Sequence, residues 1–329
     1  MSDRLATATA SALRLSPDVL ADMRCPVCQG KVQAVGDNKL QCTACATSFP
    51  IANGVPVVLN EANSVFSTED YLTGSEQHMV EPAPTLKSRI RGLIPKPSLN
   101  LKGHANYARY AELITQQTPK PRILVLGGRI LGAGMEPIAG NPNIQLVETD
   151  VCHGPRTALI CDAHDVPFAD ASFDGVIIQA VLEHVCDPYR VVSEIHRILK
   201  PNGLIYAETP FMQQVHARAW DFTRFTELGH RRLFRQFSQI DRGACGGTGM
   251  ALAWAWQYFL LSFTSIKPLR TLLRVFAEVS AFWLVYLDKL TIDSPGTQDA
   301  ASGYFFLGRR SDTILSDRQL ISEFRGEWH

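Results

Sequence analysis

The sequence has no excess of either charge, because 32 lysines and arginines balance 32 aspartates and glutamates. This balance excludes attraction of the whole chain to nucleic acid or to a membrane, so such binding would need a local patch. The first residues, MSDRLATATA, contain no continuous apolar stretch, which argues against a secretory signal and predicts a cytoplasmic location. Charged residues make up 19% and hydrophobic residues 46%, which excludes disorder over most of the chain. We expect a globular protein of about two domains.

A convincing membrane-spanning segment is also lacking, although the C-terminal region is apolar. Residues 250–266 carry no charge over seventeen residues, which is the lower limit for crossing a bilayer. A second apolar helix is predicted over 271–290, with apolar residues recurring every three or four positions. We expect 250–290 to be a helical insert that packs on the core, forms a dimer or lies at a membrane interface, which would place the protein at the inner face of the membrane.

Eight cysteines in a cytoplasmic chain are ligands or buried small side chains more often than disulfides. Four of them form two CxxC pairs, CPVC and CTAC, separated by thirteen residues. Each pair can form a knuckle around one tetrahedral zinc ion, and four thiolates leave no coordination position for a substrate. The spacing predicts a structural zinc site at Cys25, Cys28, Cys42 and Cys45.

The residues around these cysteines suggest a known small domain. After the second pair, SFPIANGVPVVL predicts two short strands that turn at Asn53-Gly54. Together with CPVC and LQCTAC, this segment resembles the zinc-ribbon family whose members are partners and activators of methyltransferases, here fused to the following domain. The resemblance implies a zinc-ribbon domain at residues 1–60 and favours a macromolecular substrate. Residues 61–103 are then expected to be a linker or cap.

The remaining chain, from residue 104, begins with a helix and then a strand at 123–126 that breaks into the glycines of GGRILGAG. Glycine is needed where the backbone passes close to a ligand or adopts positive φ. A second strand, 144–151, contains Asp150, which can accept hydrogen bonds from two ribose hydroxyls, with Glu148 as the alternative. Further strands are predicted before Asp162, at 175–180 and at 204–209, with a helix at 187–199 and a late strand at 300–310. This alternation predicts an α/β fold with ligands at the carboxyl ends of parallel strands.

Residues 122–234 resemble the class I S-adenosylmethionine-dependent methyltransferases, in particular the bacterial type-11-like group. The shared motifs are D-A-x-x-x-P-F-x-D-x-S-F-D, L-E-H-V and L-K-P-x-G. A nicotinamide-binding fold would explain the glycines but not these later motifs. The resemblance implies a Rossmann-like, mostly parallel sheet of seven strands with helices on both faces, at 104–329, and S-adenosylmethionine as cofactor. It places Gly127, Gly128 and Gly132 at the methionine portion, Asp150 at the ribose, and Asp162 with Ala163 at the adenine.

Two histidines are candidates for catalysis or contact with the methyl acceptor. His184 follows the fourth strand, and imidazole ionises near pH ~6.5, which suits proton transfer, although packing at a helix start is the alternative. His216 lies in an aromatic segment, 211–234, that we expect to cover the site as a lid. In that segment Asp221 and Arg224 either contact substrate or form a structural ion pair. Because methyl transfer mainly requires positioning, a base is needed only if the acceptor loses a proton early.

The sequence therefore predicts an S-adenosylmethionine-dependent methyltransferase with an unidentified acceptor. A small, saccharide or lipid-linked acceptor is favoured, because the apolar insert has no evident use on nucleic acid. An RNA methyltransferase, for rRNA or tRNA, is the alternative, since the segment 87–122 holds eight basic residues and one acid. A non-catalytic cofactor-binding scaffold is a third reading, because Val125 stands where many members carry an acid and Arg129 where glycine is common.

Overall fold

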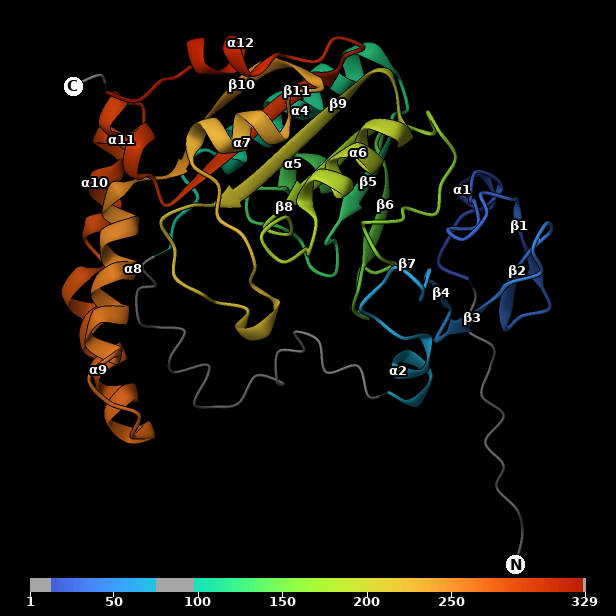
Figure 1. The fold of residues 1–329 in the computed structure, drawn as a ribbon, viewed down its shortest axis with the longest axis horizontal. Coiled ribbons are helices and arrows are strands. Elements are labelled where there is room, and N and C mark those ends of the chain that lie inside the picture. The colour runs from blue at the N-terminus through green and yellow to red at the C-terminus, as the bar shows by residue number, and fades with distance from the viewer. Residues whose placement is uncertain (1–12, 75–97, 328–329) are drawn as a thin grey trace, which may run out of the picture.

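A computed structural model describes residues 13–74 and 98–327 of the chain (Figure 1). Much of the predicted linker therefore lies outside the described residues, as does the part of the basic segment from 87 to 97. The described part of that segment contains four lysines and arginines. Three of these form ion pairs with carboxylates, namely Lys102 with Asp293, Arg109 with Asp241, and Arg122 with both Asp18 and Asp22.

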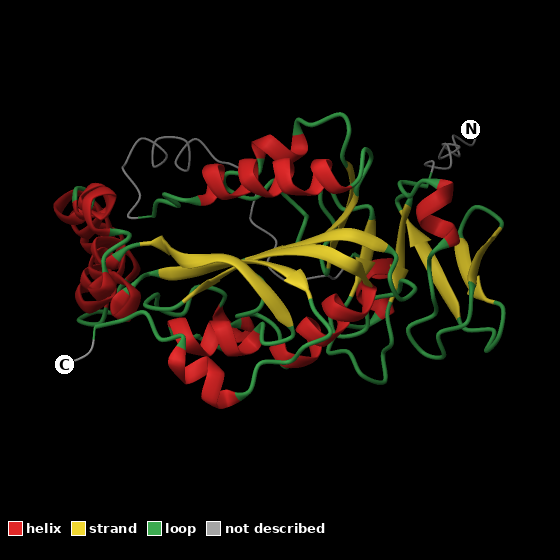
Figure 2. Ribbon diagram, turned by 90° about the horizontal axis from the view of Figure 1, so that it is seen from above, coloured by secondary structure: helices red, strands yellow, loops and turns green. Residues whose placement is uncertain are grey.

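A twisted sheet forms the centre of the protein, with helices on both faces (Figure 2). Seven strands follow the order β7-β6-β5-β8-β9-β11-β10. Neighbouring strands from β7 to β9 are parallel, whereas β11 is antiparallel to both β9 and β10. The strands are β5 (Arg122–Leu126), β6 (Gln145–Asp150), β7 (Leu159–Cys161), β8 (Phe173–Gln179), β9 (Leu199–Pro210), β10 (Phe237–Gly246) and β11 (Gly303–Arg310).

The buried strand β5 shows why helices cover both faces of the sheet. Side chains alternate between the two faces of a strand. Ile123 and Val125 pack with α4 (Gly103–Gln117), whereas Leu124 and Leu126 belong to the core that contains α6 (Pro188–Ile198). The remaining helices of this domain are α5 (Glu136–Ala139), α7 (Glu227–Leu233) and α12 (Asp317–Ser322), and a short 3-10 turn, η1, spans Arg218–Trp220.

The N-terminal module extends the sheet beyond the seven predicted strands. Its last strand pairs in parallel with β7, with Val57 opposite Ile160 and Val58 opposite Cys161, so that the whole sheet has eleven strands. Asn53 and Gly54, with φ of 52° and 78°, form the predicted turn before it. The module's side chains, among them Met23, join the hydrophobic core of the main sheet. Its elements are α1 (Pro17–Ala21), β1 (Val32–Val35), β2 (Lys39–Cys42), β3 (Ser48–Ala52) and β4 (Val55–Val58), followed by α2 (Thr68–Thr73).

The apolar insert lies at the other end of the sheet from this module (Figure 1) and comprises α8 (Thr248–Leu261), α9 (Lys267–Ala281) and α10 (Leu284–Thr291). The single helix predicted over 271–290 is wrong, because the chain turns at residues 282–283 between α9 and α10. The turn lets the Asp288 carboxylate accept hydrogen bonds from the amides of Gly249 and Met250 at the start of α8, at 2.7 and 2.9 Å. Helix α11 (Pro295–Ala300) then leads into β11. Across residues 13–74 and 98–327, no helix combines the length and hydrophobicity that crossing a bilayer requires.

Candidate active site

One cavity of about 630 Å³ opens at the carboxyl ends of β5, β6, β7 and β8. Ligands of doubly wound sheets bind at this edge. Most of the residues that the sequence predicts for cofactor or acceptor line this cavity, namely Gly127, Gly132, Asp150, Asp162, Ala163 and His184. Gly128 and His216 are not among its lining residues.

The glycine loop lies close against the end of β8. Gly127 has a φ of +80°, and a Cβ there would lie 2.3 Å from a methyl group of Val181. A Cβ on Gly132 would lie 1.9 Å from the side-chain oxygen of Gln179. Gly128 is required for a different reason, since its Cβ would press on Glu148 of β6 at 3.0 Å. The glycines therefore let the loop fold tightly against the cavity wall.

Asp150 joins the end of β6 to this loop. One carboxylate oxygen accepts a hydrogen bond from the backbone amide of Arg129 at 3.0 Å, and the other accepts one from Cys152 at 2.9 Å. Burial raises the pKa of Asp150. The alternative acid, Glu148, pairs with Arg156 at 2.5 Å and does not line the cavity. Of the two acids, Asp150 is thus the one placed to meet a ligand.

Asp162, directly after β7, is held by residues from two parts of the chain. Its Oδ2 accepts a hydrogen bond of 2.6 Å from the Ser64 hydroxyl, and its Oδ1 lies 2.6 Å from Nδ1 of His164. Nε2 of His164 accepts from the Asp187 amide at 3.0 Å, so Nδ1 carries the proton that His164 donates. Burial acts to raise the pKa of Asp162, but the hydrogen bonds from His164 and Ser64 outweigh it and lower the pKa.

Two aromatic rings from distant parts of the chain stack on each other in the wall of the cavity. Phe66, from the segment after β4, stacks on Trp220 of η1 with ring centroids 5.3 Å apart and planes inclined by 13°. Both side chains line the cavity, and Trp220 belongs to the segment 211–234, whose role as a lid stays a prediction. Within that segment Asp221 forms an ion pair with Arg224, which corresponds to the structural alternative for these two residues. Phe66 and Ser64 were not expected at this site, because both lie in the segment 61–103, which was predicted to be a linker or cap without assigned contacts.

A buried acid that the sequence analysis did not select lies at the end of β9. Glu208 accepts hydrogen bonds from the hydroxyl of Tyr206 at 2.5 Å, from Gln179 at 2.7 Å and from Asn100 at 2.8 Å. It lines the cavity, and burial raises its pKa. The sequence did contain a signal for Glu208, since it is an acid near the end of the strand predicted over 204–209. Val125 also lines the cavity and packs in the core with α4.

The two candidate histidines lie together beside the cavity. The imidazole rings of His184 and His216 are in an edge-to-face arrangement with centroids 5.1 Å apart. Glu183 lies next to both, with His184 Nε2 at 3.6 Å and His216 Nε2 at 3.8 Å from its Oε1. Burial lowers the pKa of His184 and raises the pKa of Glu183 to about 8.

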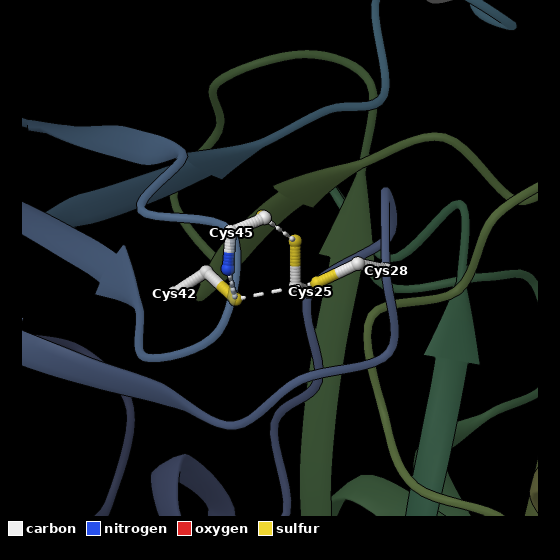
Figure 3. A group of neighbouring side chains, drawn as sticks. All are labelled: Cys25, Cys28, Cys42 and Cys45. Atoms are coloured by element: carbon white, nitrogen blue, oxygen red, sulfur yellow. Dashed lines mark hydrogen bonds between the residues drawn. The ribbon is translucent and has the colours of Figure 1, made fainter.

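The four predicted cysteine ligands converge in the N-terminal module (Figure 3). The Sγ atoms of Cys25 and Cys45 are 3.7 Å apart, and those of Cys28 and Cys42 are 3.5 Å apart. A tetrahedral ion with Zn–S bonds of about 2.3 Å requires sulfur atoms about 3.8 Å apart. The donor set and its spacing therefore fit zinc. None of the four lines the cavity.

The sheet order and the single reversed strand, β11, are those of the Rossmann-like class I methyltransferase fold, so the predicted fold class is confirmed. Residues 140–207 match the family described as "Methyltransferase domain". Demethylmenaquinone methyltransferase of Staphylococcus epidermidis is 35% identical over 99 residues, which is 28% of this chain and 36% of that protein. The ubiquinone/menaquinone biosynthesis C-methyltransferase of Desulfotalea psychrophila is 43% identical over 44 residues, 13% of this chain and 18% of that protein. The chain thus spans about a third of the length of the Staphylococcus relative.

Solved methyltransferase structures show a more distant similarity. Phosphoethanolamine N-methyltransferase 2 of Haemonchus contortus, in complex with S-adenosyl-L-methionine, is 16% identical with a TM-score of 0.38, covering 62% of this chain and 53% of that chain. The 1,6-didemethyltoxoflavin-N1-methyltransferase of Burkholderia thailandensis is 12% identical with a TM-score of 0.37, covering 64% of this chain and 80% of that chain.

Proposed function

We propose that this chain is an S-adenosylmethionine-dependent methyltransferase acting on an apolar or lipid-linked acceptor. The observation that carries the proposal is the convergence of Gly127, Asp150 and Asp162 on one cavity at the carboxyl edge of the sheet. The methyltransferase match over residues 140–207 supports the same activity. S-adenosylmethionine supplies a methyl group that is already activated by its sulfonium, so the protein mainly has to position the acceptor.

Different residues of the chain bind the adenine, the ribose and the methionine portions of the cofactor. Asp162 with Ala163 holds the adenine, Asp150 accepts from the ribose hydroxyls, and the glycine loop lies along the methionine portion. Val125 stands where many class I methyltransferases carry an acid, and Glu208 takes the place of that acid here. All hydrogen bonds to the Glu208 carboxylate come from neutral donors, so its charge is not balanced by a cation among them. A buried carboxylate is stabilised by an opposite charge, which fits the methionine ammonium.

A structural zinc ion at Cys25, Cys28, Cys42 and Cys45 holds the N-terminal module in place. The pairing of β4 with β7 brings Phe66 to the cavity and Ser64 to the side chain of Asp162. The module therefore supports cofactor binding from the same chain, in the manner of a fused activator.

The acceptor is expected to be apolar, because many side chains in the cavity wall are apolar. Its apolar lining residues include Val65, Phe66, Ile130, Leu131, Met135, Val181, Val185 and Trp220. Curated relatives named for demethylmenaquinone, a molecule with a large apolar body, favour the same class of acceptor.

The insert provides contact with an anionic membrane surface from which such an acceptor can enter. Both acids within α8–α10, Glu278 and Asp288, are buried, whereas Lys267 and Lys289 are exposed. Exposed apolar side chains with exposed basic residues are typical of helices that lie in a lipid interface. The exposed apolar residues include Phe259, Phe263, Leu272, Phe276, Trp283 and Leu290.

Vesicle co-sedimentation tests this membrane contact. The full chain should sediment with vesicles containing phosphatidylglycerol and much less with phosphatidylcholine alone. Leu272→Asp with Phe276→Asp should weaken binding about tenfold, because two charges enter the apolar face. Ile321→Asp, at another exposed apolar residue, is the matched control. Equal sedimentation of the double variant and wild type would contradict the contact.

The activity is tested by calorimetry and by product labelling with the zinc-loaded chain. Wild type should bind S-adenosylmethionine, and Asp162→Ala should weaken binding by about 1–3 kcal/mol, or roughly 5- to 150-fold. Asp170→Ala, at an exposed carboxylate, is the control. With a radiolabelled methyl group and a membrane extract, wild type should label a product soluble in organic solvent. Absence of binding heat would refute the proposal, and binding without any labelled product in lipid, saccharide or RNA fractions would favour the scaffold alternative.

A further inference from the structure

Glu183, His184 and His216 form a second cluster of metal-ligating side chains, apart from the cysteines. Each residue offers one ligand atom, and the three atoms all lie within 4.8 Å of one another. The two histidine Nε2 atoms are 3.6 and 3.8 Å from Oε1 of Glu183. Ligands of a tetrahedral ion with bonds of about 2.0–2.1 Å are roughly 3.3 Å apart, so these two distances would shorten by about 0.3–0.5 Å on binding.

The Glu183 carboxylate is buried without a hydrogen bond to any described residue. Its side chain is 1% exposed, and neither oxygen has a hydrogen-bond partner within residues 13–74 and 98–327. The guanidinium of Arg224, which lies nearby, is paired with Asp221. A buried carboxyl group without a hydrogen bond is costly unless another group compensates it. A bound cation at this position would provide that compensation.

The histidine rings are oriented so that they can serve as ligands. Nδ1 of His184 donates a hydrogen bond of 2.7 Å to the carbonyl of Trp220, which leaves a lone pair on Nε2 toward Glu183. Nδ1 of His216 lies 3.3 Å from the carbonyl of Gln214, and its Nε2 likewise faces Glu183. Metal-ligating histidines usually donate their other ring N–H to a carbonyl or carboxylate, as His184 does here, whereas Nδ1 of His216 also lies 3.4 Å from Nη2 of Arg224.

We propose that Glu183, His184 and His216 bind a divalent cation whose open coordination position receives an oxygen of the methyl acceptor. Two imidazoles and one carboxylate suit zinc or a similar divalent ion, and three protein ligands leave a position for another molecule. His184 and Trp220 both line the cavity, so that position adjoins it.

The consequence for the acceptor rests on the proposed methyltransferase function. The acceptor carries a hydroxyl group, and the cation lowers the pKa of that hydroxyl, so its proton passes to water. A bond forms between the hydroxyl oxygen and the methyl carbon while the carbon–sulfur bond breaks. The electron pair of the broken bond stays on sulfur, which changes from sulfonium to neutral thioether. The substrate class is therefore a hydroxyl compound with an apolar body.

Metal analysis after equilibrium dialysis of the full chain against Zn²⁺ tests the site. Wild type should retain two ions per chain, whereas His216→Ala and Glu183→Gln should each retain one. His104→Ala, at an exposed histidine of α4, should retain two. Cobalt bound at the second site should lack thiolate charge-transfer bands, and acetohydroxamate, a small oxygen chelator, should change its spectrum in wild type only.

These outcomes separate the cation site from the methyltransferase proposal. One ion per chain in wild type, with S-adenosylmethionine binding intact, would refute the site and leave the activity standing. Two ions per chain without binding of S-adenosylmethionine would support the cation site and refute the methyltransferase proposal. If two ions bind but acetohydroxamate leaves the cobalt spectrum unchanged, the open position and the hydroxyl acceptor are refuted. Circular dichroism and retained cofactor binding in His216→Ala show that loss of an ion is not loss of the fold.

Discussion

The hydroxyl of Ser64 donates a hydrogen bond of 2.6 Å to Asp162, across 98 residues of sequence. Ser64 follows the strand that attaches the N-terminal module to the sheet, and Asp162 follows the strand to which it attaches. The module and the proposed adenine-binding acid are therefore coupled through one contact, and loss of this contact should be measurable at the cofactor.

Ser64→Ala should weaken S-adenosylmethionine binding about fivefold. The hydrogen bond helps lower the pKa of Asp162. A hydrogen bond to a charged group contributes about 1.5–3 kcal/mol, and only part of this should be lost at the cofactor because Ser64 acts through Asp162. Calorimetry at neutral pH measures the change. Ser193→Ala, which removes a hydroxyl bound to a helix carbonyl on α6, serves as the control. Unchanged affinity would show that Ser64 does not support the cofactor site.

Glu208→Gln should discriminate between cofactor fragments. If its carboxylate meets the methionine ammonium, the variant should bind S-adenosylmethionine about 10- to 100-fold more weakly, the scale for a lost charged hydrogen bond. Binding of methylthioadenosine, which has no ammonium, should stay within about twofold of wild type. Asp162→Ala should weaken the binding of both ligands, because both carry adenine. An equal loss for both ligands in Glu208→Gln would contradict the assigned contact.

Removal of zinc should destabilise the main sheet as well as the module. The side chains of the module share the hydrophobic core of the sheet, and β4 covers the edge of β7. Binding of a structural zinc ion contributes on the order of 10 kcal/mol in isolated zinc fingers, so Cys42→Ser should cost several kcal/mol. Denaturant unfolding monitors the loss. Cys186→Ser changes an exposed cysteine outside the cluster and should be close to wild type. A small effect in Cys42→Ser would mean that the module folds without the ion.

His230 should make stability fall at mildly acidic pH. Burial, and to a lesser degree the charge of Arg242, lower its pKa to about 3, whereas an unfolded histidine ionises near pH 6.5. Below pH ~6.5 the unfolded state binds more protons, so the free energy of unfolding falls as pH falls. The His230 contribution between pH ~7 and pH ~5 is about 2 kcal/mol.

Between pH ~7 and pH ~5, the free energy of unfolding of His230→Leu should therefore fall by about 2 kcal/mol less than that of wild type. Urea unfolding at both pH values measures the difference. The ring is 2% exposed and packs edge-to-face on Phe234, so an apolar replacement keeps the site dry. His104→Ala, at an exposed position, should retain the wild-type slope. Parallel pH profiles for His230→Leu and wild type would contradict the assignment.

The sequence alone determined the features that depend on local spacing. Paired CxxC motifs bring four sulfurs together because each knuckle is closed by its own short loop, and β5, Gly127 and Asp150 follow from strand pattern and backbone geometry. The tertiary structure decided what depends on distant segments meeting. The β4–β7 pairing, the contact of Ser64 with Asp162 and the approach of His216 to Glu183 each join residues whose separation along the chain leaves no periodic signal. The break between α9 and α10 is of the same kind, because Asp288 is needed at the start of α8 only after the helices pack.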